Sequence, residues 1–195
     1  MSIKTKRMLI SWDKVLKHCL NITGIIHAGA HLAEERKIYK DIPTKWIEAD
    51  PELFFRLPVP DDTKYHFAAC NHIGIERLNI MPFKAANSLL EPNLNRRRSD
   101  VYVEDVVEVP AGMIRDIQEP GYNFLNLDIQ GAELNALKGT DLTQIDYVYT
   151  ECHNVETYFN CTQIEELDTL LLAFDRVETE WTRYGWGDAL YIRVC

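Results

Sequence analysis

Short apolar segments rich in β-branched residues alternate along the chain with segments of helical periodicity. The apolar segments are too short to be helices, and their composition is typical of buried strands. We expect strands within residues 24–28, 44–50, 65–70, 122–128 and 145–151. Because helical segments separate them, the pattern predicts an α/β fold with a mainly parallel sheet.

The two ends of the chain add a helix and a pair of antiparallel strands. Ser11 can cap a first helix, whose apolar face would consist of Trp12, Val15, Leu16, Cys19 and Leu20. Extended segments at 177–181 and 189–194 are joined by so short a link that they must pair antiparallel. We expect residues 1–23 to form an N-terminal helical cover and residues 24–195 a single domain whose sheet ends in an antiparallel strand.

Helices are expected between the strands, at 32–39, at 51–57, near 137 and, from a capping box of Thr162 and Glu165, through 174. Residues 75–83 and 101–109 are further extended segments. The polar segment 85–100 lacks periodicity, and a loop of that length in a compact domain is usually functional or mobile.

The composition limits the partners and the compartment. A formal net charge of −9 opposes binding to nucleic acid, because the phosphates would be repelled. Arg96, Arg97 and Arg98 form the one dense basic run, which is typical of a solvated loop. Five cysteines without a C-x-x-C pair indicate reduced thiols, a cytoplasmic protein, and neither a disulfide framework nor a zinc site. Charges interrupt the N-terminal apolar segment, so neither a signal peptide nor a membrane partner is indicated.

Polar side chains follow the end of every central strand. In open parallel sheets, ligands bind beyond these carboxyl ends. The side chains there are His27, His31, Glu48, Asp50, Asn71, His72, Asp128, Gln130, Glu151 and His153. Small residues around Gly29 let a ligand approach the backbone, and an acid about twenty residues later, Glu48, can accept hydrogen bonds from ribose hydroxyls. The pattern favours a nucleoside-binding site.

Each of these side chains also has an alternative interpretation. His27 is equally compatible with a hydrogen-bonded core histidine. His31 can cap a helix, and Glu151 can pair with an arginine. A metal bound by Asp128, Glu151 and His153, together with the two early histidines, is a further alternative. Those two histidines do not share a helix, so the geometry of helical zinc sites does not apply and no metal is expected.

Four motifs occur in a characteristic order: Ile26–His31 with Glu34–Glu35, Trp46–Pro51, Asn126–Leu134 and Gly185–Tyr191. In this order they resemble the FkbM family of S-adenosylmethionine-dependent methyltransferases, and the third, centred on Leu-Asp-Ile-Gln-Gly-Ala-Glu, is the most specific. The resemblance implies a class I methyltransferase (Rossmann-like) α/β sandwich. Such a sandwich has a mainly parallel seven-stranded sheet, an antiparallel last strand and helices on both faces.

The resemblance also implies how S-adenosylmethionine is bound. The Gly29 turn would face the methionine part, Glu48 would hold the ribose, and Asn71 would flank the adenine. Asp128 and Gln130 would lie near the amino-acid end or the methyl group. The residues expected to contact the cofactor are His27, Gly29, Ala30, His31, Glu48, Ala49, Asn71, Asp128 and Gln130.

Members of this family are typically associated with methylation of hydroxyl groups on sugars or natural products, so a small-molecule or carbohydrate acceptor is expected. The acceptor hydroxyl must lose a proton, and the candidate bases at the strand ends are Asp128, Glu151 and His153. His153 has the most suitable unperturbed pKa, and Glu151 would orient it or grip the substrate. Ser88 and the basic run Arg96–Arg98 would contribute to the acceptor pocket or, equally, lie in solvent.

Two other functions fit the same pattern. A nicotinamide-dependent oxidoreductase would also use Glu48 for ribose, although G-x-G-x-x-G is absent. A non-catalytic nucleoside- or cofactor-binding module would keep the fold without turnover. The sequence does not indicate an oligomeric state.

Overall fold

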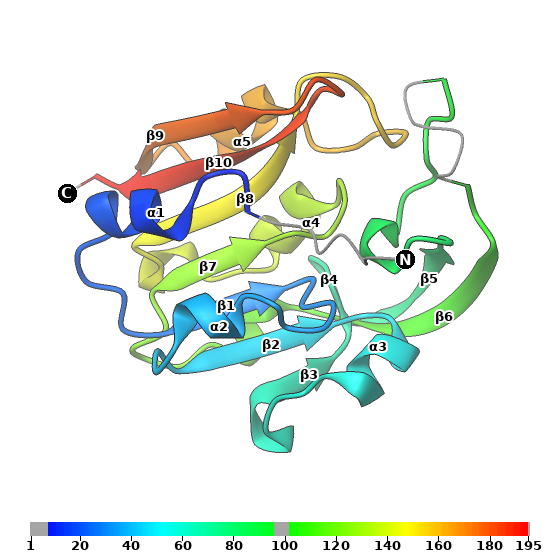
Figure 1. The fold of residues 1–195 in the computed structure, drawn as a ribbon, viewed down its shortest axis with the longest axis horizontal. Coiled ribbons are helices and arrows are strands. Elements are labelled where there is room, and N and C mark those ends of the chain that lie inside the picture. The colour runs from blue at the N-terminus through cyan, green and yellow to red at the C-terminus, as the bar shows by residue number, and fades with distance from the viewer. Residues whose placement is uncertain (1–7, 96–101, 195) are drawn as a thin grey trace.

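The computed structural model describes residues 8–95 and 102–194, and its centre is a seven-stranded sheet (Figure 1). In spatial order the strands are β3 (Lys64–His66), β2 (Thr44–Glu48), β1 (Ile25–Ala28), β7 (Phe124–Leu127), β8 (Tyr147–His153), β10 (Trp186–Arg193) and β9 (Phe174–Trp181). Neighbouring strands are parallel from β3 to β8, whereas β10 is antiparallel to both β8 and β9. The predicted sheet, mainly parallel with an antiparallel last strand, is confirmed.

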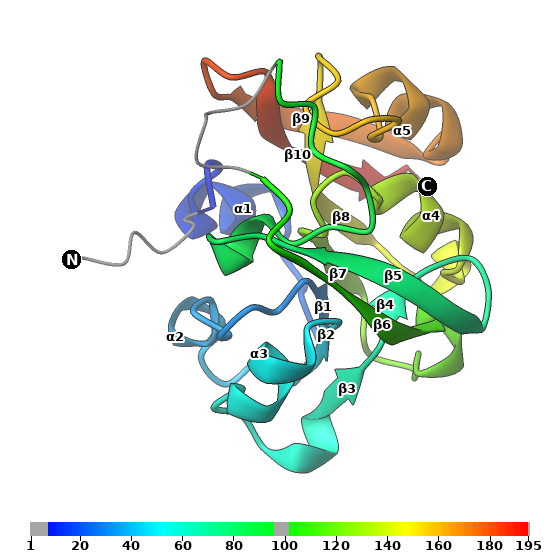
Figure 2. The ribbon, with the colours of Figure 1, turned by 90° about the vertical axis from the view of Figure 1, so that its right-hand side faces the viewer.

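Helices cover both faces of this sheet (Figure 2). One face carries α1 (Trp12–His18), α2 (Arg36–Tyr39) and α3 (Pro51–Arg56), and the other carries α4 (Glu133–Lys138) and α5 (Ile164–Leu170). Because successive strand residues point to opposite faces, Ile25 and Ile26 belong to different clusters of buried side chains. Of the helices that the structure describes, none is long and apolar enough to cross a membrane.

A second sheet, of three strands, lies beside the carboxyl ends of the first (Figure 1). It consists of β4 (Ala68–Ala69), β6 (Asp105–Gly112) and β5 (Gly74–Ile80). The single strand expected at 65–70 is divided, because His66 pairs with β2 whereas Ala68 pairs with β6. Single 3₁₀ turns connect several elements: η1 (Asp61–Thr63), η2 (Lys84–Ala86), η3 (Ile114–Asp116) and η4 (Leu142–Gln144).

The segment after β1 differs from the prediction. A helix was expected from residue 32, but α2 begins only at Arg36. His31 and Ala33 have positive φ angles of 49° and 51°, which interrupt a right-handed helix. The amide groups of Gly29 and Ala30 donate to the carbonyl of Ile47 at 3.0 Å instead of facing a ligand. An irregular turn therefore follows β1 where a helix was expected to begin.

The N-terminal helix α1 packs through a narrower apolar face than expected. Ser11 caps it as predicted, accepting a backbone N–H at 3.4 Å. Val15 and Cys19 are buried, but Leu16 and Leu20 are 43% and 85% exposed. Leu16 and Leu20 therefore do not belong to the face that covers the sheet. The boundary at residue 23 stays a prediction.

Helix α5 is capped one residue later than expected. Gln163 and Glu166 form the capping box, in which the carboxylate of Glu166 accepts the backbone N–H of Gln163 at 2.9 Å. Thr162 cannot serve as the cap, because its hydroxyl donates to the carbonyl of Gly131 and accepts the amide of Leu134. The hydroxyl thus joins α5 to the turn before α4.

Candidate functional site

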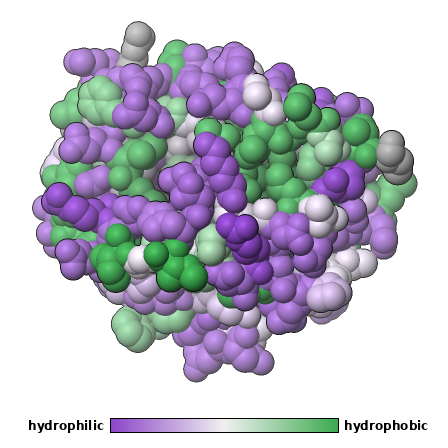
Figure 3. All heavy atoms as spheres, turned by 180° about the vertical axis from the view of Figure 1, so that it is seen from behind, coloured by the Kyte–Doolittle hydropathy of each residue, from purple (hydrophilic) through white to green (hydrophobic). Residues whose placement is uncertain are grey.

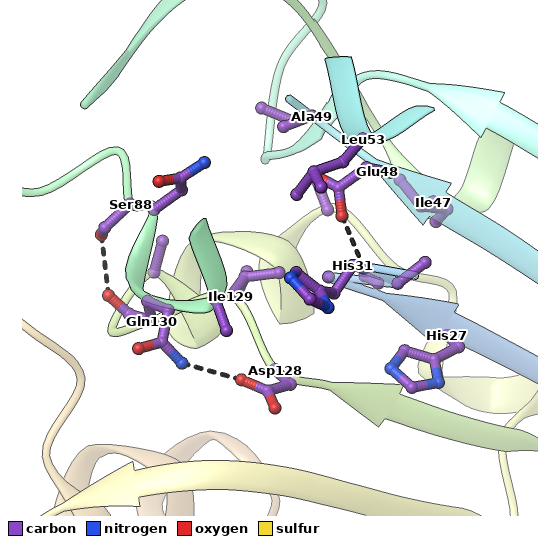
Figure 4. Close-up of a pocket in the computed structure, with 18 of the residues that line it drawn as sticks. His27, His31, Ile47, Glu48, Ala49, Leu53, Ser88, Asp128, Ile129 and Gln130 are labelled. Atoms are coloured by element: carbon purple, nitrogen blue, oxygen red, sulfur yellow. Dashed lines mark hydrogen bonds between the residues drawn. The ribbon is translucent and has the colours of Figure 1, made fainter. Parts of the chain in front are cut away.

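A pocket opens at the carboxyl ends of β1, β2 and β7 (Figure 4). Its apolar wall comes from both sheets and from α3, and it includes Ile47, Leu53, Ala68 and Leu78. The predicted site residues that line it are His27, Gly29, Ala30, His31, Glu48, Ala49, Ser88, Asp128 and Gln130. An apolar wall with a few converging polar groups is typical of a small-molecule site.

Glu48 ends β2 with a buried carboxylate held by two backbone amides. Its Oε2 accepts from the amide of His31 at 2.7 Å, and its Oε1 accepts from the amide of Asp50 at 2.8 Å. Burial raises the pKa of Glu48 to about 7, partly offset by these two hydrogen bonds. Because each oxygen is held by one backbone amide, its remaining lone pair can accept a hydrogen bond from a hydroxyl group of a ligand in the pocket.

Gly29 is required by the turn that follows β1. Its φ angle is 85°, and a Cβ atom there would lie 1.9 Å from the carbonyl oxygen of Asp128. This close approach brings the turn against the end of β7, where the amide of Asp128 donates to the carbonyl of Ala28 at 3.0 Å. A glycine is therefore needed both for its conformation and for its lack of a side chain.

His31 projects into the pocket between Glu48 and Asp128 (Figure 4). Its Nδ1 lies 3.0 Å from a carboxylate oxygen of Glu34. Burial lowers the pKa of His31, but the hydrogen bond to Glu34 and the nearby carboxylates outweigh it and raise the pKa overall. His31 does not cap α2, whose N-cap residue is Glu35.

His27 both lines the pocket and belongs to a buried polar chain. Its Nδ1 lies 3.2 Å from the hydroxyl of Tyr39, which in turn accepts from the side-chain amide of Asn126 at 2.7 Å. The ring of Trp46 lies beside it, with centroids 5.2 Å apart. His27 is therefore a hydrogen-bonded core histidine, and its contact with a ligand stays a prediction. The sequence analysis missed Tyr39 and Asn126, although both occupy inward positions of their elements.

Gln130 joins the residues predicted at the ends of β7 and β8. Its Nε2 donates to Asp128 at 2.8 Å and to Glu151 at 2.7 Å, and its Oε1 lies 2.9 Å from the hydroxyl of Tyr158. The hydroxyl of Ser88 donates to the backbone carbonyl of Gln130 at 2.8 Å. Gln130 therefore separates buried Glu151 from the pocket and fixes the carboxylate of Asp128.

The position of His153 does not favour the role of base that was expected for it, and that role stays a prediction. The side chain is fully buried and does not line the pocket. Its Nδ1 is hydrogen-bonded to the hydroxyl of Thr157 at 2.9 Å, and its Nε2 lies 3.6 Å from Glu151. In this arrangement both His153 and Glu151 are buried, and neither lines the pocket. Burial of a strand on both faces extended further along β8 than the sequence indicated.

Other predicted residues also lie elsewhere. Asn71 is exposed and is not among the residues that line the pocket, although neighbouring Ala69 is. The basic run Arg96–Arg98 lies outside the described residues. Within the described part of the chain, the strand-end acids and histidines do not form a group of three whose ligand atoms lie within 4.8 Å of one another. The convergence on a metal that was considered for them is not found.

The sheet order and the pocket define the class of protein. A mainly parallel seven-stranded sheet with an antiparallel β10 is the sheet of a class I methyltransferase fold. The chain belongs to the methyltransferase FkbM domain family, whose model matches residues 27–178. The family predicted from the sequence is confirmed, and this match supports S-adenosylmethionine as the cofactor.

The chain is similar to several solved structures. The chain is 15% identical to a methyltransferase FkbM from Methylobacillus flagellatus KT, with a TM-score of 0.59 over 96% of this chain and 48% of that one. It is 11% identical to a magnesium protoporphyrin IX methyltransferase from Synechocystis PCC 6803 with bound SAM, with a TM-score of 0.46 over 93% and 77%. It is 12% identical to a SAM-dependent methyltransferase from Aquifex aeolicus, with a TM-score of 0.43 over 93% of this chain and 89% of that one.

The chain thus spans about half the length of the FkbM structure that it matches. No curated protein matches it.

Proposed function

We propose that the protein transfers the methyl group of S-adenosylmethionine to a hydroxyl group of a sugar or another small natural product. The observation that carries this proposal is the carboxylate of Glu48, which two backbone amides aim into a pocket that also contains the Gly29 turn and Asp128. The polar groups of this pocket match those of a nucleoside that carries a zwitterionic amino acid. The family match supports the reaction class.

The residues present fit the cofactor part by part. Leu53, Ala68 and Leu78 offer apolar surface for the adenine, and Glu48 offers acceptors for the ribose hydroxyls. His31, whose raised pKa favours a positive charge, suits the carboxylate of the methionine part. When bound, the cofactor supplies an electrophilic methyl group on a sulfonium.

Asp128 is the proposed base, because it is the one of the three candidate bases that lines the pocket. Its Oδ1 is held by Gln130, which itself is held by Glu151. A carboxylate fixed in this way can orient the acceptor hydroxyl and take up its proton as the oxygen attacks. Glu151 acts as a positioning residue, and Ser88 positions Gln130 through its backbone.

Calorimetric titration with S-adenosylmethionine and S-adenosylhomocysteine tests the cofactor. We expect micromolar dissociation constants for the wild type and a loss of at least about tenfold, or 1.4 kcal/mol, in Glu48→Gln. Glu165→Gln, an exposed change in the first turn of α5, is the matched control and should bind as the wild type does. Absence of binding at millimolar ligand, in protein that unfolds cooperatively, would overturn the proposal.

A binding module without turnover is the second candidate. It is favoured by the length comparison, because the similarity covers only 48% of the FkbM structure and part of an acceptor site can lie outside this chain. This candidate predicts cofactor binding without formation of S-adenosylhomocysteine. A screen of sugar and natural-product hydroxyls against the bound protein distinguishes the two functions.

A further inference from the structure

The turn that joins β4 to β5 brings three metal-ligand side chains together. Within the described part of the chain, Cys70, His72 and Glu76 are the one group of at least three His, Cys, Asp or Glu residues whose ligand atoms all lie within 4.8 Å of one another. None of the three lines the pocket, and the proposed methyl transfer does not use them.

These three side chains form a floor and a mouth. Cys70 is fully buried, and its amide donates to the carbonyl of Gly112 at 2.8 Å, which fixes the position of the thiol against the small sheet. The side chains of His72 and Glu76 are 44% and 34% exposed. An ion can therefore enter from solvent, and a water molecule can complete its coordination.

The spacing of the two exposed ligands suits one tetrahedral ion. The Nε2 atom of His72 lies 3.4 Å from Oε1 of Glu76. Nitrogen and oxygen ligands bound at about 2.0–2.1 Å in a tetrahedron stand about 3.3 Å apart. Little movement is needed for both atoms to bind the same ion.

Asn71 holds the imidazole of His72 in the orientation that a metal ligand needs. Its Oδ1 lies 3.2 Å from Nδ1 of His72. When Nδ1 donates this hydrogen bond, the lone pair is on Nε2, which faces Glu76. Such a partner on the second ring nitrogen is the usual companion of a metal-bound histidine. Gly74 leaves room beside the ring, since a Cβ atom there would lie 3.4 Å from Cδ2 of His72.

We propose that Cys70, His72 and Glu76 bind a divalent transition-metal ion such as Zn²⁺, with water as the fourth ligand. Thiolate and imidazole ligands select zinc-like ions over Mg²⁺ and Ca²⁺. The ion would clamp the β4–β5 turn. Because Ala69 and Leu78, on either side of this turn, line the pocket, the ion would also steady one pocket wall. The proposal does not depend on the methyltransferase activity.

The test is a titration of the metal-free, untagged chain of 195 residues with Co²⁺, in a Cys195→Ser background that removes the thiol of residue 195. We expect one equivalent to bind with a thiolate-to-cobalt absorption band and visible tetrahedral bands, which Zn²⁺ abolishes and Mg²⁺ does not. Cys70→Ser should remove the thiolate band. His72→Ala and Asn71→Ala should weaken binding at least about tenfold.

His18→Ala is the matched control, because His18 also lies beside a carboxylate, 3.0 Å from Glu178, but these two side chains and the thiol of neighbouring Cys19 do not form a group whose ligand atoms all lie within 4.8 Å of one another. It should leave the titration unchanged. His72 and Glu76 are partly exposed, so His72→Ala and Glu76→Gln decide the matter even if Cys70→Ser does not fold. The proposal is wrong if the folded protein gives no thiolate band, or if the band and its affinity persist in His72→Ala.

Discussion

Two buried glutamates, Glu48 and Glu133, each accept hydrogen bonds from two backbone amides, but the two side chains serve different purposes. Glu48 lines the pocket, with its two oxygens each fixed by one backbone amide. Glu133, in the first turn of α4, is fully buried away from the pocket, and one oxygen accepts the amides of both Ile129 and Gly131 at 3.2 and 3.0 Å. Glu48 is aimed at a ligand, whereas Glu133 holds the turn that carries Gln130.

The comparison divides the site into an open half at the ends of β1 and β2 and a largely closed half at the ends of β7 and β8, where Asp128 and Gln130 line the pocket but Glu133 and Glu151 are buried behind it. In the closed half, burial and the charge of Glu151 raise the pKa of Glu133 to about 8. A carboxylic acid that stays protonated near neutral pH can be sealed in the interior at lower cost than a charged one. A buried acid beside the site is thus not by itself a catalytic acid. Its contacts determine whether it binds a ligand or stabilises the surrounding fold.

The largest effect is expected where the two halves touch. Gly29→Ala would place a Cβ atom 1.9 Å from the carbonyl of Asp128 at a φ angle of 85°, so we expect a loss of about 3 kcal/mol or more in unfolding free energy and no cofactor binding. Gly121→Ala is the matched control. Its φ angle is 96°, but no atom lies within 4 Å of the added Cβ, so about 1–2 kcal/mol is expected. Urea unfolding measures both; equal losses would mean that the close contact is not rigid.

The second prediction separates catalysis from support. Asp128→Asn should reduce formation of S-adenosylhomocysteine at least about 100-fold with little change in cofactor affinity, because the amide cannot take the acceptor proton. Asp175→Asn, an exposed change on β9, is its control. His153→Asn should cost about 1–3 kcal/mol of stability but leave turnover of the folded protein within about threefold. Turnover lost in His153→Asn at full stability would restore His153 as the base.

The third prediction uses pH to distinguish the two glutamates. Both have folded-state pKa values, about 7 for Glu48 and about 8 for Glu133, above the ordinary value of 4.5. Their protonated forms therefore stabilise the fold. This contribution is full below about pH 4.5 and is lost as the pH rises through each folded pKa.

Glu133→Gln should keep its hydrogen bonds and flatten the fall in unfolding free energy between about pH 6 and 9 by about 2 kcal/mol. Saturating S-adenosylhomocysteine should reduce the contribution of Glu48 to this fall in unfolding free energy, because ribose hydroxyls favour the charged carboxylate. The contribution of Glu133 should remain. Denaturant unfolding at stepped pH measures this. A ligand effect that persists in Glu48→Gln would contradict the assignment.

Local periodicity was sufficient for the sheet, because strands buried on both faces are nearly continuous apolar runs, as in β1 and β7. It was not sufficient for backbone that long-range contacts shape. The positive φ of His31 accompanies the hydrogen bond of its amide to Glu48, seventeen positions away. Likewise the division of residues 65–70 between two sheets depends on pairing with β6, which no local pattern contains.

The open half of the site was predictable because its residues follow strand ends directly, as Glu48 does. The closed half was not, because Gln130 separates Glu151 from the pocket only in three dimensions. Cys70, His72 and Glu76 were not predicted as a group, because Cys70 is not part of a C-x-x-C pair. A cysteine followed by a histidine two positions on, across a turn into a strand, was the available signal.

The smallest effect tests whether the buried polar chain behind His27 belongs to the open or the closed half. Tyr39→Phe leaves Nδ1 of His27 and the side-chain amide of Asn126 without this partner, at a cost of about 1–2 kcal/mol. Tyr65→Phe, in the edge strand β3, is the control and should cost less than about 0.5 kcal/mol. If the chain only supports the sheet, affinity for S-adenosylhomocysteine falls less than about threefold. A fall beyond about tenfold, without further loss of stability, would mean that His27 must be held in one orientation to contact the cofactor, and the polar chain would then belong to the binding half of the site.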